Sequence, residues 1–131
     1  MLLAALLDAG ASVERLRAVP GGLGIGPVDI SVERVARHGI GALQVTVVQP
    51  PDPPPRTWRR LREILEGADL EPRVRTRALA VFTGLAEAEA KIHGSSVDDV
   101  QFHELGGVDT LVDVCGSADL LEDLAVERVF C

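Results

Sequence analysis

Aromatic side chains are scarce in this chain of 131 residues, which has no tyrosine, one tryptophan and three phenylalanines. Hydrophobic residues nonetheless make up 47% of the sequence, and this proportion excludes a wholly disordered chain. The core must therefore be built mainly from leucine, valine, isoleucine and alanine. The length suffices for one domain with a core of its own.

Cysteine pairs and long apolar runs are missing as well. The two cysteines, Cys115 and Cys131, form neither a disulfide framework nor a CxxC metal motif, so we expect a reducing compartment and a core position for Cys115. The apolar stretch at residues 1–10 has no basic leader, contains Asp8 and is too short to cross a bilayer. We predict a soluble, cytoplasmic protein with no membrane partner.

Positive charge is in deficit, with a formal net charge of −7. An acidic chain repels phosphate backbones, so we expect no nucleic-acid partner. Seven arginines lie between Arg56 and Arg77, whereas nine acidic residues and a single basic one, Arg128, lie from His93 onward. The middle could meet an anion and the last part a cation, but a solvated surface explains the same asymmetry equally well.

The order of helix and strand patterns predicts an α+β fold with a small mixed or antiparallel sheet covered by helices. Ser12 and Thr57 are expected to cap helices, Pro72 suits a first helical turn, and Gly94 a helix end. We treat residues 1–131 as a single domain with an extended proline-rich spacer at 50–55. The expected helices are 2–9, 12–19, 57–66, 72–93 and 108–124, and the expected strands are 28–35, 43–47, 100–105 and 126–131, with a hairpin turn at 38–41.

A histidine and several carboxylates gather at one predicted junction between a strand and a helix. His103 and Glu104 end the strand, a double-glycine turn follows, and Asp109 opens the helix. Asp113 lies four residues later, so its carboxylate shares a helix face with that of Asp109. Imidazole and carboxylate ligands suit a divalent ion such as manganese, magnesium or nickel, and the absence of a thiolate pair argues against structural zinc.

A purely structural interpretation of this junction stays open. A carboxylate at Asp109 would stabilise the first turn of the helix through the helix dipole. Asp109 and Asp113 also lie opposite an apolar stripe that includes Leu111 and Cys115, where solvated residues belong. Glu104 could pair with an arginine. Spacing alone does not decide between a site and a solvated surface.

The junction resembles a motif of the LarC family of nickel-insertion proteins, HxHExGAxDxxxDxxG, which reads QFHELGGVDTLVDVCG at residues 101–116. Residues 85–94, LAEAEAKIHG, resemble the LAEAEAxxHG end of the family's preceding helix. Residues 1–10 resemble the segment that follows the family's GxSGD motif. The resemblance spans most of the chain and implies the N-terminal portion of a family member, without that GxSGD motif and without the back portion.

The resemblance implies an activity: CTP-dependent insertion of nickel, the substrate metal, into the pyridinium-3,5-bisthiocarboxylic acid mononucleotide cofactor of lactate racemase. The enzyme would be a nickel chelatase, a lyase, with manganese or magnesium accompanying CTP. His103, Glu104 and Asp109 would be catalytic, and these three with Asp113 would be metal ligands. A C-terminal LarC chain would be a partner, and a homo-oligomer is a further option. Two alternatives stay open: a noncatalytic metal-binding or scaffolding subunit that needs a second chain, and an inactive remnant.

The chain departs from the family pattern at two positions of the motif and in one loop. Gln101 replaces the first histidine, and Gly107 replaces the alanine. The proline-rich spacer stands where many members carry a histidine-rich run. Strand alternation places Gln101 on the same face as His103. We therefore expect Gln101 to weaken a nickel site, and we expect the chain alone to insert nickel poorly.

Overall fold

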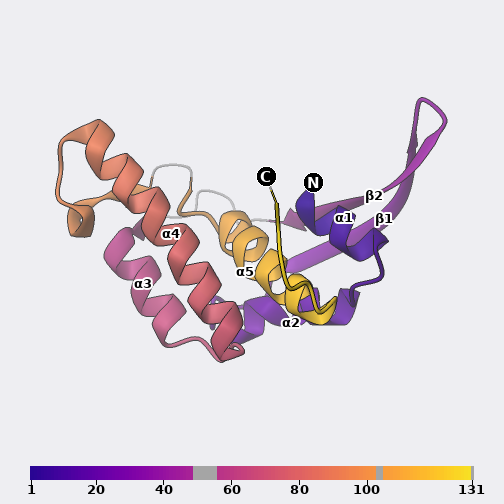
Figure 1. Cartoon of the computed structure of the whole chain (residues 1–131), viewed down its shortest axis with the longest axis horizontal. Helices are drawn as coiled ribbons and strands as arrows, with labels where there is room; N and C mark the ends of the chain where they lie inside the picture. The colour runs from indigo at the N-terminus through magenta and orange to yellow at the C-terminus, as the bar shows by residue number, and fades with distance from the viewer. Residues whose placement is uncertain (49–55, 103–104, 131) are drawn as a thin grey trace.

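The computed structural model describes residues 1–48, 56–102 and 105–130. Within these residues both sheets are two-stranded and antiparallel, so the structure confirms the predicted α+β class. No helix in the described ranges is both long enough and apolar enough to cross a membrane. The elements in chain order are α1 (Leu2–Asp8), α2 (Val13–Gly22), β1 (Asp29–Arg37), β2 (Ile40–Val48), β3 (Arg56–Thr57), α3 (Trp58–Glu66), α4 (Pro72–His93), the 3₁₀ helix η1 (Val97–Asp99), β4 (Gln101–Phe102) and α5 (Val108–Asp123) (Figure 1).

The helix ends follow the capping residues in the sequence. The Ser12 hydroxyl accepts the Arg15 N–H at 3.3 Å, and the Thr57 hydroxyl accepts the Arg60 N–H at 3.2 Å. These bonds satisfy backbone donors that have no partner within a first helical turn. The expected end of α2 at Val19 is wrong, because the helix continues to Gly22. Proline removes only its own N–H from the ladder, and the Leu23 N–H still donates to the Val19 carbonyl at 3.0 Å.

The predicted hairpin is confirmed by the pairing of β1 with β2. Its turn residues His38 and Gly39 have φ values of 51° and 81°, which give the turn a twist that matches the right-handed twist of the strands. The register places Ile30 opposite Val47 and Val32 opposite Val45. These apolar side chains pack with α1 at the base of the hairpin, while its outer half extends away from the helices (Figure 1).

Helix α5 lies between α4 on one side and α1 and α2 on the other (Figure 1), and it contributes to both clusters of buried residues. One of its faces packs with α3, α4 and Phe102, and the other with α1, α2 and the hairpin. Cys115 is fully buried in the first cluster, as predicted. The junction that precedes α5 is therefore fixed to the most buried helix of the described structure.

Two strand predictions need correction. Within the expected strand 100–105, the described part forms a strand only at Gln101–Phe102, which pairs with Arg56–Thr57. Val126–Phe130 forms no strand, and Val129 and Phe130 are exposed. A strand requires a neighbouring edge to supply its hydrogen bonds, and no described strand pairs with this segment. The proline-rich spacer and Cys131 lie outside the described residues.

Candidate functional site

The junction before α5 is fastened to the short strand β3. The Trp58 N–H donates to the Val100 carbonyl at 2.9 Å, and Phe102 is 1% exposed. The Arg56 guanidinium donates to the Gly106 carbonyl at 2.6 Å, so the turn is held from the side of β3. His103 and Glu104 lie outside the described residues, and their predicted roles stay predictions.

Gly106 is required by close packing against backbone atoms. A Cβ at this position would lie 3.0 Å from the Phe102 carbonyl oxygen and 3.2 Å from the Arg56 nitrogen. Both neighbours belong to the β3–β4 ladder and cannot move aside without breaking it. The space beside Gly106 is therefore occupied by protein.

Asp109 already serves the start of α5. The N-cap is Gly107, which has no side chain, and Oδ1 of Asp109 accepts the Thr110 N–H at 2.8 Å. A carboxylate in a first turn also interacts favourably with the helix dipole. The structural role considered for Asp109 is thus present. Its Oδ2 accepts no hydrogen bond from the described residues and is the atom that could bind a cation.

Asp113 lies one turn further along the same face of α5. Burial of its carboxyl group raises its pKa above the ordinary value, and the Asp109 carboxylate adds to this rise, while the α-amino group of Met1 opposes it. The residue as a whole is exposed, and no hydrogen bond or ion pair joins its carboxylate to the rest of the described chain. The two carboxylates therefore interact electrostatically, as the four-residue spacing predicts.

The described residues supply two of the four proposed metal ligands. Among them, no group of three or more histidine, cysteine, aspartate and glutamate side chains converges in a way that could hold a metal ion. Carboxylates at Asp109 and Asp113 are ligands that magnesium and manganese accept and that bind nickel less strongly than imidazole or thiolate. The chemistry of this pair fits a weakly held divalent cation.

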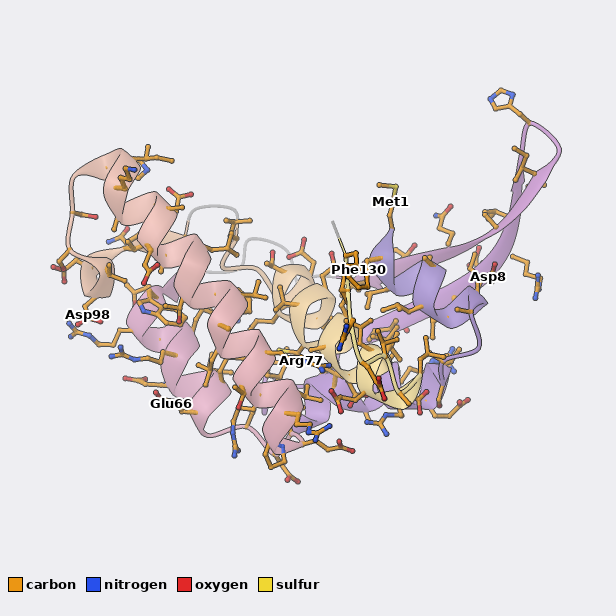
Figure 2. The ribbon with its side chains drawn as sticks, in the orientation of Figure 1. Met1, Asp8, Glu66, Arg77, Asp98 and Phe130 are labelled. Atoms are coloured by element: carbon orange, nitrogen blue, oxygen red, sulfur yellow. The ribbon has the colours of Figure 1, made fainter. Side chains whose placement is uncertain are left out.

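A groove of about 600 Å³ runs beside Asp113, between α1, α4 and α5. The sequence alone does not indicate this groove, because the groove depends on where α4 lies against α5. Its polar groups are Asp113 and Ser117 on α5 and Arg77 on α4, and its apolar lining consists of Leu2, Ala80, Val81, Val114, Ala118 and Leu121. Arg77 faces α5, where its guanidinium contacts the Glu122 carboxylate (Figure 2).

Another carboxylate of α5, Asp119, has a structural role. It is 8% exposed and accepts two hydrogen bonds from Arg15, at 3.0 Å from Nε and 2.6 Å from Nη2. The hydrogen bonds to Asp119 raise the pKa of Arg15 above its ordinary value. This two-point pair ties α2 to α5 and leaves Asp109 and Asp113 as the acidic residues available on the other face.

Comparison with known proteins identifies the family. A sequence profile described as nickel insertion protein matches residues 1–131. The chain belongs to the nickel insertion protein family. No solved structure matches it significantly.

Relatives from several bacteria align along nearly the whole chain. A protein of Thermomicrobium roseum named as a candidate nickel insertion protein is 44% identical over 100% of this chain and 32% of its own length. A protein of Myxococcus xanthus with the same name is 45% identical over 98% of this chain and 34% of its own length. A Nocardioides protein named pyridinium-3,5-bisthiocarboxylic acid mononucleotide nickel insertion protein is 46% identical over 88% of this chain and 30% of its own length. The chain thus spans about a third of the length of these relatives.

Two of the segments that resemble the LarC family meet in space at the end of α4. His93 and Gln101 line one hollow of about 200 Å³ together with Ser95 and Asp99. Gln101 is exposed, so it does not point into the core. The His93 ring lies 3.2 Å from the Glu89 carboxylate. Gln101 therefore lies beside a histidine, although the sequence separates them by a turn and a 3₁₀ helix.

Proposed function

We propose that this chain takes part in the insertion of nickel into pyridinium-3,5-bisthiocarboxylic acid mononucleotide. The observation that carries the proposal is the family match over residues 1–131. It is supported by the 46% identity to the Nocardioides protein, whose name states this substrate. We further propose CTP as cosubstrate with manganese or magnesium, and the lactate racemase cofactor as product.

The carboxylate pair on α5 suits the chemistry that such an insertion requires. Nickel must leave its donor ligands and bind the sulfur atoms of the precursor. Carboxylate oxygens hold nickel less strongly than sulfur ligands do, so Asp109 and Asp113 would release the ion in the required direction. The sulfur atoms of the precursor are already anionic near neutral pH, whereas a ring carbon that binds nickel must lose its proton. We propose His103 and Glu104 as the groups that accept this proton.

A second candidate function is a noncatalytic metal-binding or scaffolding subunit that works with another polypeptide. The observation that favours it is the pair of carboxylates at Asp109 and Asp113, because two such ligands suit a weakly held divalent cation. A separate C-terminal chain would then supply the remaining groups. The two candidates differ in whether this chain turns over the precursor when nothing else is added.

Isothermal titration calorimetry with nickel and with manganese tests the metal site. We expect His103→Ala and Asp109→Asn to weaken binding, because each removes a proposed ligand. Asp98→Asn is the matched control, since Asp98 is an exposed carboxylate of η1 that pairs with Arg62 at 3.3 Å. Equal affinities in all four proteins would exclude the junction as the site.

An insertion assay with nickel, CTP and the thiolated precursor separates the two candidate functions. We expect little product from the chain alone, and more when the unmatched portion of the Nocardioides relative is added as a second polypeptide. Full turnover by this chain alone would reject the subunit interpretation. If neither condition gives product although the chain binds nickel, the chain binds the metal without inserting it, and the chelatase function is rejected.

A further inference from the structure

The groove between α1, α4 and α5 has the dimensions and lining of a small-molecule site. Its volume of about 600 Å³ lies within the range typical of ligand pockets. Small residues on the two long helices, Ala80, Ser117 and Ala118, line its walls, so a flat ligand could lie close to both helix backbones. Leu2 and Val81 border it and are exposed by 56% and 48%. A ligand in the groove would cover both.

Charge is arranged asymmetrically in this groove. Asp113 contributes a partly buried carboxylate, and the positive group that acts on it is the α-amino group of Met1. Arg77 contributes a guanidinium, and Arg73 lies near it, one turn earlier on α4. Both arginines contact the same carboxylate, that of Glu122, and the Arg73 contact measures 3.7 Å. One carboxylate shared by two guanidinium groups leaves a net positive charge at this end.

We propose that the groove binds a pyridinium mononucleotide, with the cationic ring against the apolar lining beside Asp113 and the phosphate at Arg77 and Arg73. The inference rests on the proposed function, because the ligand class comes from the substrate named for the Nocardioides relative. A carboxylate attracts a pyridinium nitrogen by its charge, and guanidinium groups bind phosphate in a bidentate manner. The negative pole at Asp113 and the positive pole at the arginines therefore match the ring nitrogen and the phosphate of such a nucleotide.

This placement changes the role of Asp113. The two thiocarboxyl groups of the substrate flank the ring carbon that lies opposite the ring nitrogen. If the nitrogen faces Asp113, these sulfur-bearing groups point away from it, which avoids repulsion between like charges. Asp113 then contacts the ring nitrogen in addition to the place proposed for it, with Asp109, in the metal site. An apolar polypeptide in the groove would supply no further positive charge beside Asp113.

The test uses three commercially obtainable probes that differ in one property each. Nicotinamide mononucleotide carries a pyridinium ring and a phosphate, its reduced form has a neutral ring with the same phosphate, and nicotinamide riboside has the cationic ring alone. We expect the first to bind this chain at least about threefold more tightly than either of the others, measured by titration of backbone amide NMR signals. The shifted signals should belong to α4 and α5 around the groove.

Substitutions assign the two poles. Asp113→Asn should remove the preference for the charged ring and retain the preference for phosphate. Arg77→Met should do the reverse, and Arg73→Gln provides a second test at the phosphate end if Arg77→Met unfolds the chain by leaving Glu122 unpaired. The matched controls are Asp98→Asn and Arg62→Met, which remove an exposed ion pair far from the groove and should bind all probes like the wild type.

The failure of this inference is distinguishable from failure of the proposed function. Equal binding of the charged and reduced mononucleotides, or shifts outside the groove, would overturn the inference, while calorimetry at the metal site would still report on nickel. Self-association that Val81→Asp abolishes would show that a second copy covers the groove and would also overturn it. Weaker nickel binding in Asp113→Asn with unchanged nucleotide binding would show that Asp113 serves the metal site alone and would also overturn the inference.

Discussion

Gly116 in the middle of α5 allows a direct measurement of how tightly this helix is packed. A Cβ at this position would lie 2.6 Å from Cδ1 of Leu16 and 3.1 Å from Cδ2 of Leu3, both in the core. Gly116→Ala should gain about 1 kcal/mol of helix propensity. Forcing a methyl group into filled space costs about 1–3 kcal/mol, because buried leucines must leave their preferred rotamers. The net expectation is a loss of stability of up to about 2 kcal/mol.

Gly84 on α4 supplies the matched control. It is exposed, and an added Cβ would meet nothing within 4 Å. Gly84→Ala should therefore show the gain in helix propensity alone, about 1 kcal/mol. Urea unfolding followed by far-ultraviolet circular dichroism gives both values, and their difference isolates the packing term. If Gly116→Ala stabilises the protein as much as Gly84→Ala does, the close approach of α1 and α2 to α5 is refuted.

Three further predictions concern single side chains. Burial raises the pKa of Cys115 to about 12, so its thiol should react slowly. In a Cys131→Ser background at about pH 8, a thiol reagent should modify the native protein at least about a thousandfold more slowly than the urea-unfolded protein. Comparable rates would contradict the buried position of Cys115. Because the pKa of Asp113 is raised, its ionisation opposes folding, so Asp113→Asn should stabilise the protein at about pH 7 and lose this advantage by about pH 3; an advantage that persists in acid would have another cause. Gln101→His should add an imidazole to the hollow that contains His93 and raise the ratio of nickel affinity to manganese affinity by at least about tenfold. This preference should fade below about pH 6, where the new ring is protonated. An unchanged ratio of affinities would remove this position from the site.

Local sequence signals predicted the helices and the hairpin because the physical causes are local. Ser12 and Thr57 cap their own helices, and the turn at His38–Gly39 needs only two residues that accept positive φ. The pairing of β3 with β4 could not be predicted in this way. Each strand has two residues, and its position depends on a contact between Arg56 and Phe102 across the chain. Val126–Phe130 shows the opposite case, in which strand-forming residues lack a partner strand.

The candidate site also has features that local sequence signals predict and features that depend on distant contacts. The shared face of Asp109 and Asp113 follows from helix geometry alone, because the two residues lie four positions apart in α5. Sequence could not show that Asp113 borders a groove, since the groove depends on α4 lying beside α5. It also could not separate Asp119 from the other acidic residues, because its partner Arg15 is 104 positions away. The reason for Gly106 became evident only from the position of the β3 backbone.

The hairpin has a consequence for how the chain can be handled and labelled. Its outer half extends beyond α1, and in the described part of the chain each strand there pairs only with its neighbour (Figure 1). Two-stranded ribbons without a covering layer are marginally stable, so backbone amides should exchange with deuterium in a gradient, slowest near Ile30 and fastest near the turn. Opening of the turn would leave the helices undisturbed. A fluorophore or an affinity tag inserted at His38–Gly39 should therefore report on the chain without altering the groove or the metal site.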